Sequence, residues 1–260
     1  MNLLNTKDIY SQNVEYLPFK VEIATRQDLV RVANLRAASY GKHLPSLGSQ
    51  LKQPEAADFE RGCEVFVATT KLDGSTLGTL RTHANVSKPL PLQASMSLPL
   101  RLRGTRMVET TRLSILGGTQ SLVVRTALFK ALHQYCAQQK VDWMMAAGRR
   151  PVDRIYDSLM FSDVGESKVY YPMAHAGGVP HRVMTLATDQ VETVWGTHEH
   201  ALHGFFFATS HPDIDLSGAK CLNFAWDCPE STVTAPSLQE KPRGPLFPSI
   251  WPNFSPSLAV

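Results

Sequence analysis

The order of strand-like and helix-like segments limits most strongly what this chain can fold into. Two strand-like runs, 64–70 and 76–83, are joined through Asp73-Gly74, which is a strong hairpin signal. The run before them alternates like a strand and enters a helix whose start is marked by Thr25 and Asp28. In chain order we expect strand 19–24, helix 26–39, strands 64–70, 76–83 and 107–116, helix 120–139, strand 141–147, helix 152–159, strand 181–187 and helix 188–209. This order predicts a mixed α/β sheet flanked by helices.

Length and composition fit one domain with additions at both ends. With 260 residues, 43% of them hydrophobic, the chain can bury one sizeable core but is short for two domains. Residues 84–105 are rich in Pro, Ser and Leu and predict a long irregular connection. Seven prolines between residues 229 and 260 oppose regular structure there. We expect an N-terminal leader over 1–18, the domain with a C-terminal extension over 19–215, and a tail or wrapping arm over 216–260.

Charge, cysteine usage and hydropathy bound the compartment and the partners. A net charge of +3 does not favour a general nucleic-acid binder. The four cysteines form no CxxC pair, which is typical of reduced thiols in a cytosolic protein. The chain shows neither a signal-peptide core nor an apolar run near the ~20 residues that span a bilayer. We therefore expect a cytoplasmic protein without a transmembrane segment, and peripheral contact with a membrane stays open.

Arg36 falls on the apolar face of the first helix, four residues before Tyr40. A guanidinium on such a face is costly unless a partner neutralises it. Two interpretations remain open at this point. The side chain reaches the edge of the core and places its charge in solvent, or it fixes a carboxylate of the protein or of a substrate.

Glu109 and Arg112 lie among apolar residues of the strand 107–116. Positions three apart point to opposite faces of a regular strand. A bulge at Thr110 or Thr111 would bring both side chains to one face. Without the bulge they are charged residues of an exposed edge, and the spacing does not decide between the two.

Three further groups of residues have both a functional and a purely structural interpretation. Gly117-Gly118-Thr119 precedes a helix, whose free N–H groups suit an anion or a pantetheine amide, although most such turns only connect elements. The cluster Arg149, Arg150 and Arg154 forms either a solvated face or a docking surface for an acidic partner. A run of histidines lies close together but lacks the spacing of metal ligands, so we predict no metal: His198, His200, His203 and His211.

Read together, several segments resemble one family. Leu35-Arg36-Ala37-Ala38-Ser39-Tyr40 resembles the first-helix element of acyl-homoserine-lactone synthases, and Glu109-Thr110-Thr111-Arg112 resembles their E-T/S-S/T-R strand motif. Between them, Asp58 precedes a hairpin whose second strand contains Gly78-Thr79-Leu80-Arg81, as in that family. The long-chain N-acyl amino acid synthases share these elements. The later segment from Arg154 to Phe161 is similar to the GNAT helix that ends in Y-x-x-L-G-F.

This resemblance implies a GNAT-like fold with a mostly antiparallel central sheet, a C-terminal helical extension and a proline-rich tail. It implies an N-acyltransferase that moves a fatty acyl group from an acyl carrier protein or CoA thioester to the α-amine of an amino acid, with no cofactor. Lactone synthases usually carry a tryptophan after the first helix, where S-adenosylmethionine sits, and the segment 41–45 has none. The alternatives are a lactone synthase that uses S-adenosylmethionine and a non-catalytic acyl-binding protein of the same fold.

The resemblance also implies roles for individual residues. Glu109, directly or through water, is expected to take a proton from the amine, and Tyr156 is expected to return one to the leaving thiolate unless it is only a core aromatic. Small and apolar residues between strand 141–147 and the preceding helix are expected to line the acyl tunnel. The acceptor side is expected to comprise Arg36, Tyr40, Asp58, Arg81 and Arg112; the donor side Gly117, Gly118 and Thr119; and the carrier-protein surface Arg149, Arg150 and Arg154.

Overall fold

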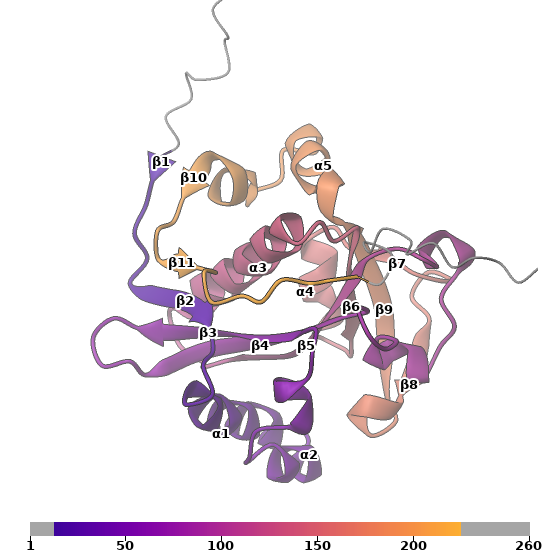
Figure 1. Ribbon diagram of the computed structural model, residues 1–260, viewed down its shortest axis with the longest axis horizontal. Helices are drawn as coiled ribbons and strands as arrows, with labels where there is room; N and C mark the ends of the chain where they lie inside the picture. The colour runs from indigo at the N-terminus through magenta and orange to yellow at the C-terminus, as the bar shows by residue number, and fades with distance from the viewer. Residues whose placement is uncertain (1–12, 225–260) are drawn as a thin grey trace, which may run out of the picture. The chain divides into compact units, whose positions relative to one another are not determined.

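The computed structural model describes residues 13–224, which build one large mixed sheet with helices on both faces (Figure 1). The strand order is β11-β2-β3-β4-β5-β6-β9-β7, and β8 also pairs with β9. Most neighbours are antiparallel, while β5–β6 and β11–β2 are parallel. The strands of this sheet are β2 (Phe19–Ile23), β3 (Cys63–Thr70), β4 (Thr76–Ala84), β5 (Met107–Ile115), β6 (Trp143–Gly148), β7 (Ser162–Asp163), β8 (Tyr170–Met173), β9 (Val179–Ala187) and β11 (Ile214–Asp215).

The helices divide between the two faces of the sheet. In Figure 1, α1 (Asp28–Gly41) and α2 (Pro45–Gln50) lie below the sheet, and α3 (Ser121–Gln138) and α4 (Asp153–Ser158) lie above it. The main core forms between α3 and the sheet, where Phe66, Leu80 and Leu128 are fully buried. Gly78 allows this packing because an added Cβ would lie 2.7 Å from a methyl group of Val124. The predicted strands and helices as far as strand 181–187 are present in the predicted order, whereas α2, β7, β8 and β11 were not predicted.

The connection 84–105 is more ordered than its composition indicates. It contains the short helical turns Pro91–Ala94 and Leu100–Leu102. Its leucines pack in a second core with Met107 and Met145, on the face of the sheet away from α3. The connection therefore covers β5 at the position of Glu109.

β5 and β6 part in the middle of the sheet. Their parallel pairing runs from Met107↔Trp143 to Thr110↔Ala146 and then stops, although both strands continue. Beyond this point β5 carries one extra residue opposite Leu80, and Arg112 has a left-handed backbone with φ of 54°. The expected bulge thus exists, but it is centred on Arg112 and not on Thr110 or Thr111.

The prediction of one continuous helix over 188–209 is wrong. The structure has a 3-10 turn at Thr188–Gln190, helix α5 at Val191–Thr197 and a π-helical turn at Gly204–Ala208. Glu199 has a φ of 50°, which ends α5 because an L-residue in that conformation cannot continue a right-handed helix. The C-terminal extension is therefore helical only in pieces.

The described parts of the expected leader and tail are both attached to the domain. β1 (Asn13–Val14) pairs in parallel with β10 (Thr209–Ser210), and Leu17 is buried. After β11 the chain returns to the core, where Phe224 is 2% exposed. Residues 1–12 and the proline-rich segment 229–260 lie outside the described residues. Within the described residues, no helix has the length and apolar character to cross a membrane.

Candidate active site

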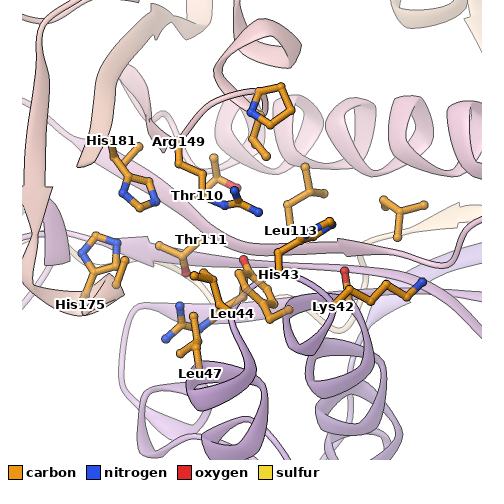
Figure 2. Close-up of a pocket in the computed structure, with 18 of the residues that line it drawn as sticks. Lys42, His43, Leu44, Leu47, Thr110, Thr111, Leu113, Arg149, His175 and His181 are labelled. Atoms are coloured by element: carbon orange, nitrogen blue, oxygen red, sulfur yellow. The ribbon is translucent and has the colours of Figure 1, made fainter. Parts of the chain in front are cut away.

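A pocket of about 390 Å³ opens where β5 and β6 part (Figure 2). β5 contributes Thr110, Thr111 and Arg112 to its wall, and the opposite wall begins with Ala147 at the end of β6. The remaining lining comes from the end of β5 and the turn after it, from α1, α2 and the loop between them, from α4 and the segment before it, and from the β8–β9 hairpin: Leu113, Ile115, Gly117, Ser39, Tyr40, Lys42, His43, Leu44, Leu47, Arg149, Pro151, Val152, Tyr156, His175, Ala176 and His181.

A buried ion-pair network braces one side of this pocket. Arg36 donates from Nη1 to both carboxylate oxygens of Asp58, at 2.8 and 2.9 Å. Arg81 contacts Asp58 at 3.1 Å and Glu55 at 3.0 Å, and Arg112 grips Glu55 in a bidentate pair at 2.9 and 2.7 Å. The left-handed backbone at Arg112 places its guanidinium on the side of the sheet that faces α1. The network joins α1, the turn Ala56–Phe59, β4 and β5.

These contacts decide between the interpretations of the arginines. Arg36 is 1% exposed and holds a carboxylate of the protein, so it does not reach into solvent. Burial alone would raise the pKa of Glu55, but the hydrogen bond from Arg112 and the charges of the arginines lower it to about 2. Glu55 is therefore ionised, and it shares the three arginines with Asp58. Arg36, Arg81 and Arg112 are occupied by these two residues.

Glu109 has a different environment from these carboxylates. It is 0% exposed, is not among the residues that line the pocket, and faces the second core across from His83. Its Oε2 accepts a hydrogen bond from the Leu92 N–H at 2.9 Å, and its Oε1 has no partner among the described residues. Burial raises the pKa of Glu109 to about 8, so the carboxyl is mostly protonated at pH 7.

The two tyrosines do reach the pocket. Tyr156 of α4 is 3% exposed and packs edge-on against Phe129 and Phe161. Burial raises the pKa of its phenol, so the hydroxyl keeps its proton at neutral pH. Tyr40 is half-buried, with the Arg112 guanidinium 5.9 Å from its ring centroid. Both residues stand where a substrate in the pocket would touch them.

The expected donor turn borders a neighbouring hollow. A smaller cavity of about 180 Å³ is lined by Gly117, Gly118 and Thr119 together with residues at the start of α3. Gly117 lines both this cavity and the main pocket. Gly118 has a φ of 128°, a conformation that L side chains rarely adopt. The turn therefore connects the pocket to the N-terminus of α3.

The three clustered arginines occupy different positions. Arg149 lines the pocket, where Figure 2 shows its side chain beside Thr110. Arg150 is exposed and packs against Tyr170, with its guanidinium 4.8 Å from the ring centroid and a hydrogen bond of 3.0 Å to the hydroxyl. Arg154 is exposed on α4. Two of the three are thus surface residues next to the pocket, and one belongs to the pocket itself.

The four neighbouring histidines have separate surroundings: His200 stacks on Trp195, and the Lys130 ammonium lies 2.7 Å from Nδ1 of His211. Another group, Glu60, Cys63 and His83, has ligand atoms close enough together for a metal ion. The Lys88 ammonium, however, pairs with the carboxylate of Glu60. The positive charge of Lys88 therefore already neutralises Glu60, which makes this group a poor site for a metal ion.

Three residues of the site were missed from the sequence. Glu55 had one available signal, since it forms a capping box with Asp58 three residues later. His175 and His181 lie in the β8–β9 hairpin. No sequence pattern marked them, because they reach the pocket only through the packing of this hairpin in the folded chain.

A mostly antiparallel sheet with one parted parallel pair, a pocket in the parting and a glycine turn leading into a helix are features of the GNAT fold. The sequence model of the family described as N-acyl amino acid synthase FeeM matches residues 31–184, which is more than half of the chain. The chain belongs to this family, and the predicted family and fold are confirmed.

Solved structures agree on the fold. The structure of FeeM, an N-acyl amino acid synthase from uncultured soil microbes, superimposes with a TM-score of 0.53 at 13% identity, covering 69% of this chain and 96% of that one. BjaI, a CoA-dependent acyl-homoserine lactone synthase, superimposes with a TM-score of 0.50 at 11% identity, covering 74% and 93%. A search of curated protein sequences found no match to this chain.

Proposed function

We propose that this acyltransferase moves a fatty acyl group from the thioester of acyl carrier protein to the α-amine of an amino acid, giving an N-acyl amino acid. The observation that carries the proposal is the pocket between the parted strands, which connects the α1–α2 side of the sheet with the turn before α3. A thioester arm that enters at Gly117 and an amine that enters beside α1 would meet there.

The parted strands supply the polar groups that such a reaction needs. The edges of β5 after Thr110 and of β6 after Ala146 face each other without ladder hydrogen bonds. Their backbone N–H and C=O groups are therefore free to bind the amides of a pantetheine arm and the oxygen of the tetrahedral intermediate. Tyr156, which lines the pocket and keeps its proton, remains our proposed donor to the leaving thiolate.

The acceptor's carboxylate requires a cation that is not already paired. Arg36, Arg81 and Arg112 bind Glu55 and Asp58, whereas Arg149 has no acidic partner among residues 13–224. We therefore assign the acceptor carboxylate to Arg149. Glu109 is fully buried outside the pocket lining and mostly protonated at pH 7, so its carboxyl does not contact an amine held in the pocket.

The acyl chain has an apolar route behind Tyr156. A small apolar cavity between α3, β6 and the C-terminal extension includes Phe129 and Phe161, the two rings that pack against Tyr156. Its volume is only about 20 Å³, so a long acyl chain requires the side chains around it to move. Met144 of β6 and Leu132 of α3 also line it, which supports placing the acyl tunnel between this strand and the preceding helix.

A carrier protein is favoured as the donor by the exposed Arg150 and Arg154 beside the pocket, since carrier proteins are acidic. CoA is the competing donor, because the structurally similar BjaI is described as CoA-dependent. Purified protein should be given matched acyl-carrier and acyl-CoA thioesters with a mixture of amino acids, and the products identified by mass spectrometry. An N-acyl amino acid formed faster from the carrier thioester supports the proposal. A lactone formed only with S-adenosylmethionine, or no acyl product, refutes it.

A further inference from the structure

We propose that His181, at the start of β9, is the base that takes the proton from the acceptor's ammonium group while Arg149 holds the acceptor's carboxylate. This inference rests on the proposed function and names the residues that would carry its first chemical step. It replaces Glu109 in that role with a side chain that lines the pocket.

The hydrogen bonding of His181 fixes which nitrogen can act as a base. Its Nδ1 lies 2.7 Å from the carbonyl oxygen of Val179. A carbonyl only accepts hydrogen bonds, so Nδ1 carries the proton and Nε2 of the neutral ring keeps its lone pair. Within residues 13–224, Nε2 makes no hydrogen bond. The ring therefore has an open acceptor at the wall of the pocket.

The strand register places His181 next to Arg149. Gly148 and Arg182 are partners in the antiparallel β6–β9 pair, so Arg149 and His181 are the next positions along the two chains. Figure 2 shows both side chains at the same end of the pocket, near Thr110. The ammonium and carboxylate of an α-amino acid are attached to one carbon. A cation and a base on adjacent positions fit that arrangement.

His175 adds a second acceptor at this end of the pocket. Its ring centroid lies 6.4 Å from that of His181, and Figure 2 shows the two imidazoles side by side. Nδ1 of His175 is buried and has no partner among the described residues. An ammonium group has three N–H donors, so it can satisfy this nitrogen while it gives one proton to His181.

Burial and the neighbouring positive charges keep the His181 ring neutral. Burial lowers the pKa of His181, the hydrogen bond to the Val179 carbonyl opposes this, and the charges of Arg149 and Arg112 lower the pKa further. His175 is likewise neutral, since burial brings its pKa to about 4, and Tyr171 is the cross-strand neighbour on β8. At pH 7 His181 can thus accept a proton, whereas Glu109 already holds one.

The proposed step is balanced in atoms and charge. His181 removes one proton from the ammonium, and the nitrogen lone pair attacks the thioester carbon to form the C–N bond. When the tetrahedral intermediate collapses, the C–S bond breaks and the nitrogen loses a second proton. The thiolate takes up one proton, so the products are an amide, a free thiol and the proton held by His181.

The test compares His181→Asn and Glu109→Gln with wild type, using the donor and acceptor that wild type accepts. His198→Asn is the matched control, because His198 also bonds its backbone through Nδ1 but is exposed on the extension. We expect kcat of His181→Asn to fall about 100-fold or more with the KM of the donor unchanged. For His181→Asn, kcat/KM for the acceptor should rise about tenfold per pH unit, because the variant depends on amine that is already deprotonated in solution. The kcat/KM of wild type should reach its plateau at a lower pH.

A His181→Asn rate within about twofold of wild type overturns the inference, and so does a loss confined to Glu109→Gln. If His181→Asn unfolds more easily, His181→Ala with added imidazole decides: restored turnover supports the base role and no restoration overturns it. Wild-type protein that forms no amide with any donor contradicts the proposed function itself, which is a different result.

Discussion

At the residue scale, the partly buried Glu55 and the fully buried Glu109 have opposite protonation states. Glu55 is ionised because three guanidinium groups surround it, and Glu109 is protonated because burial outweighs the Leu92 N–H and the charge of Arg81. The same side-chain chemistry therefore holds a charge in one place and a proton in the other. Only Glu55 contributes to the network that braces the pocket.

Glu109→Gln should flatten the pH dependence of stability. Unfolded Glu109 ionises near its usual pKa of 4.5, while the folded carboxyl keeps its proton to about pH 8. Between these values the unfolded state binds fewer protons, so wild type loses up to about 1.4 kcal/mol of unfolding free energy per pH unit relative to the variant. Urea unfolding at pH 5, 6, 7 and 8 measures the difference. Parallel curves for the two proteins would show that Glu109 titrates normally.

Asp58→Asn should destabilise the fold strongly. It removes the anion that faces the 1%-exposed Arg36 and leaves that charge buried, a loss of about 3–5 kcal/mol. Glu60→Gln is the control, because the pair of Glu60 with Lys88 is exposed and contributes at most about 1 kcal/mol. Chemical denaturation at pH 7 compares the two. Equal losses would mean that the buried network adds nothing beyond a surface pair.

At the element scale, the site depends on irregularities of otherwise regular elements. Helical periodicity predicted α3, and apolar runs bounded by turn residues predicted β3, β4, β5 and β6, which are buried mostly on both faces. The exact bulge position was not predictable, since it depends on the pairing of Arg112 with Glu55 from a distant turn. The long helix over 188–209 was overpredicted, since nothing in its apolar pattern signals the left-handed Glu199.

Gly48→Ala should disturb the wall that α1 and α2 give to the pocket. A Cβ at Gly48 would lie 2.5 Å from the Cα of Gly41, a backbone atom that cannot rotate away. We expect a loss of about 1–3 kcal/mol and a higher KM for the acceptor, because Leu44 and Leu47 of this wall must shift. Gly204→Ala, where a Cβ meets nothing within 4 Å, is the control. Equal Tm and KM in both variants would contradict the close packing of α1 and α2.

At the scale of the described chain, the site is assembled from segments far apart in sequence. Glu55 pairs with Arg112, and the C-terminal extension is fastened to α3 by Lys130, whose ammonium donates to the carbonyls of Phe205 and Thr209 at 2.7 and 2.6 Å. Local sequence patterns carry no record of such contacts. For this reason the sequence predicted Arg36, Arg81 and Asp58 as members of the site but could not tell which partners they hold.

Charge reversal of Arg150 and Arg154 should weaken use of a carrier-protein donor. Both are exposed beside the pocket, so Arg150→Glu with Arg154→Glu would repel an acidic carrier and raise its KM by roughly tenfold or more at low salt. The KM of a matched acyl-CoA should change less. Lys20→Glu with Lys140→Glu, two exposed positions outside the pocket, gives the same change in net charge. An equal effect of both pairs would indicate a general charge effect and no docking surface.

The most direct measurement of the proposed reaction counts both products in one experiment. Purified full-length protein is incubated with an acyl-carrier thioester and a mixture of amino acids, and free thiol and N-acyl amino acid are quantified over time. We predict that the two products appear in a one-to-one ratio. Thiol release without amide would mean that the pocket hydrolyses thioesters, and the absence of both would contradict acyl transfer at the parting of β5 and β6.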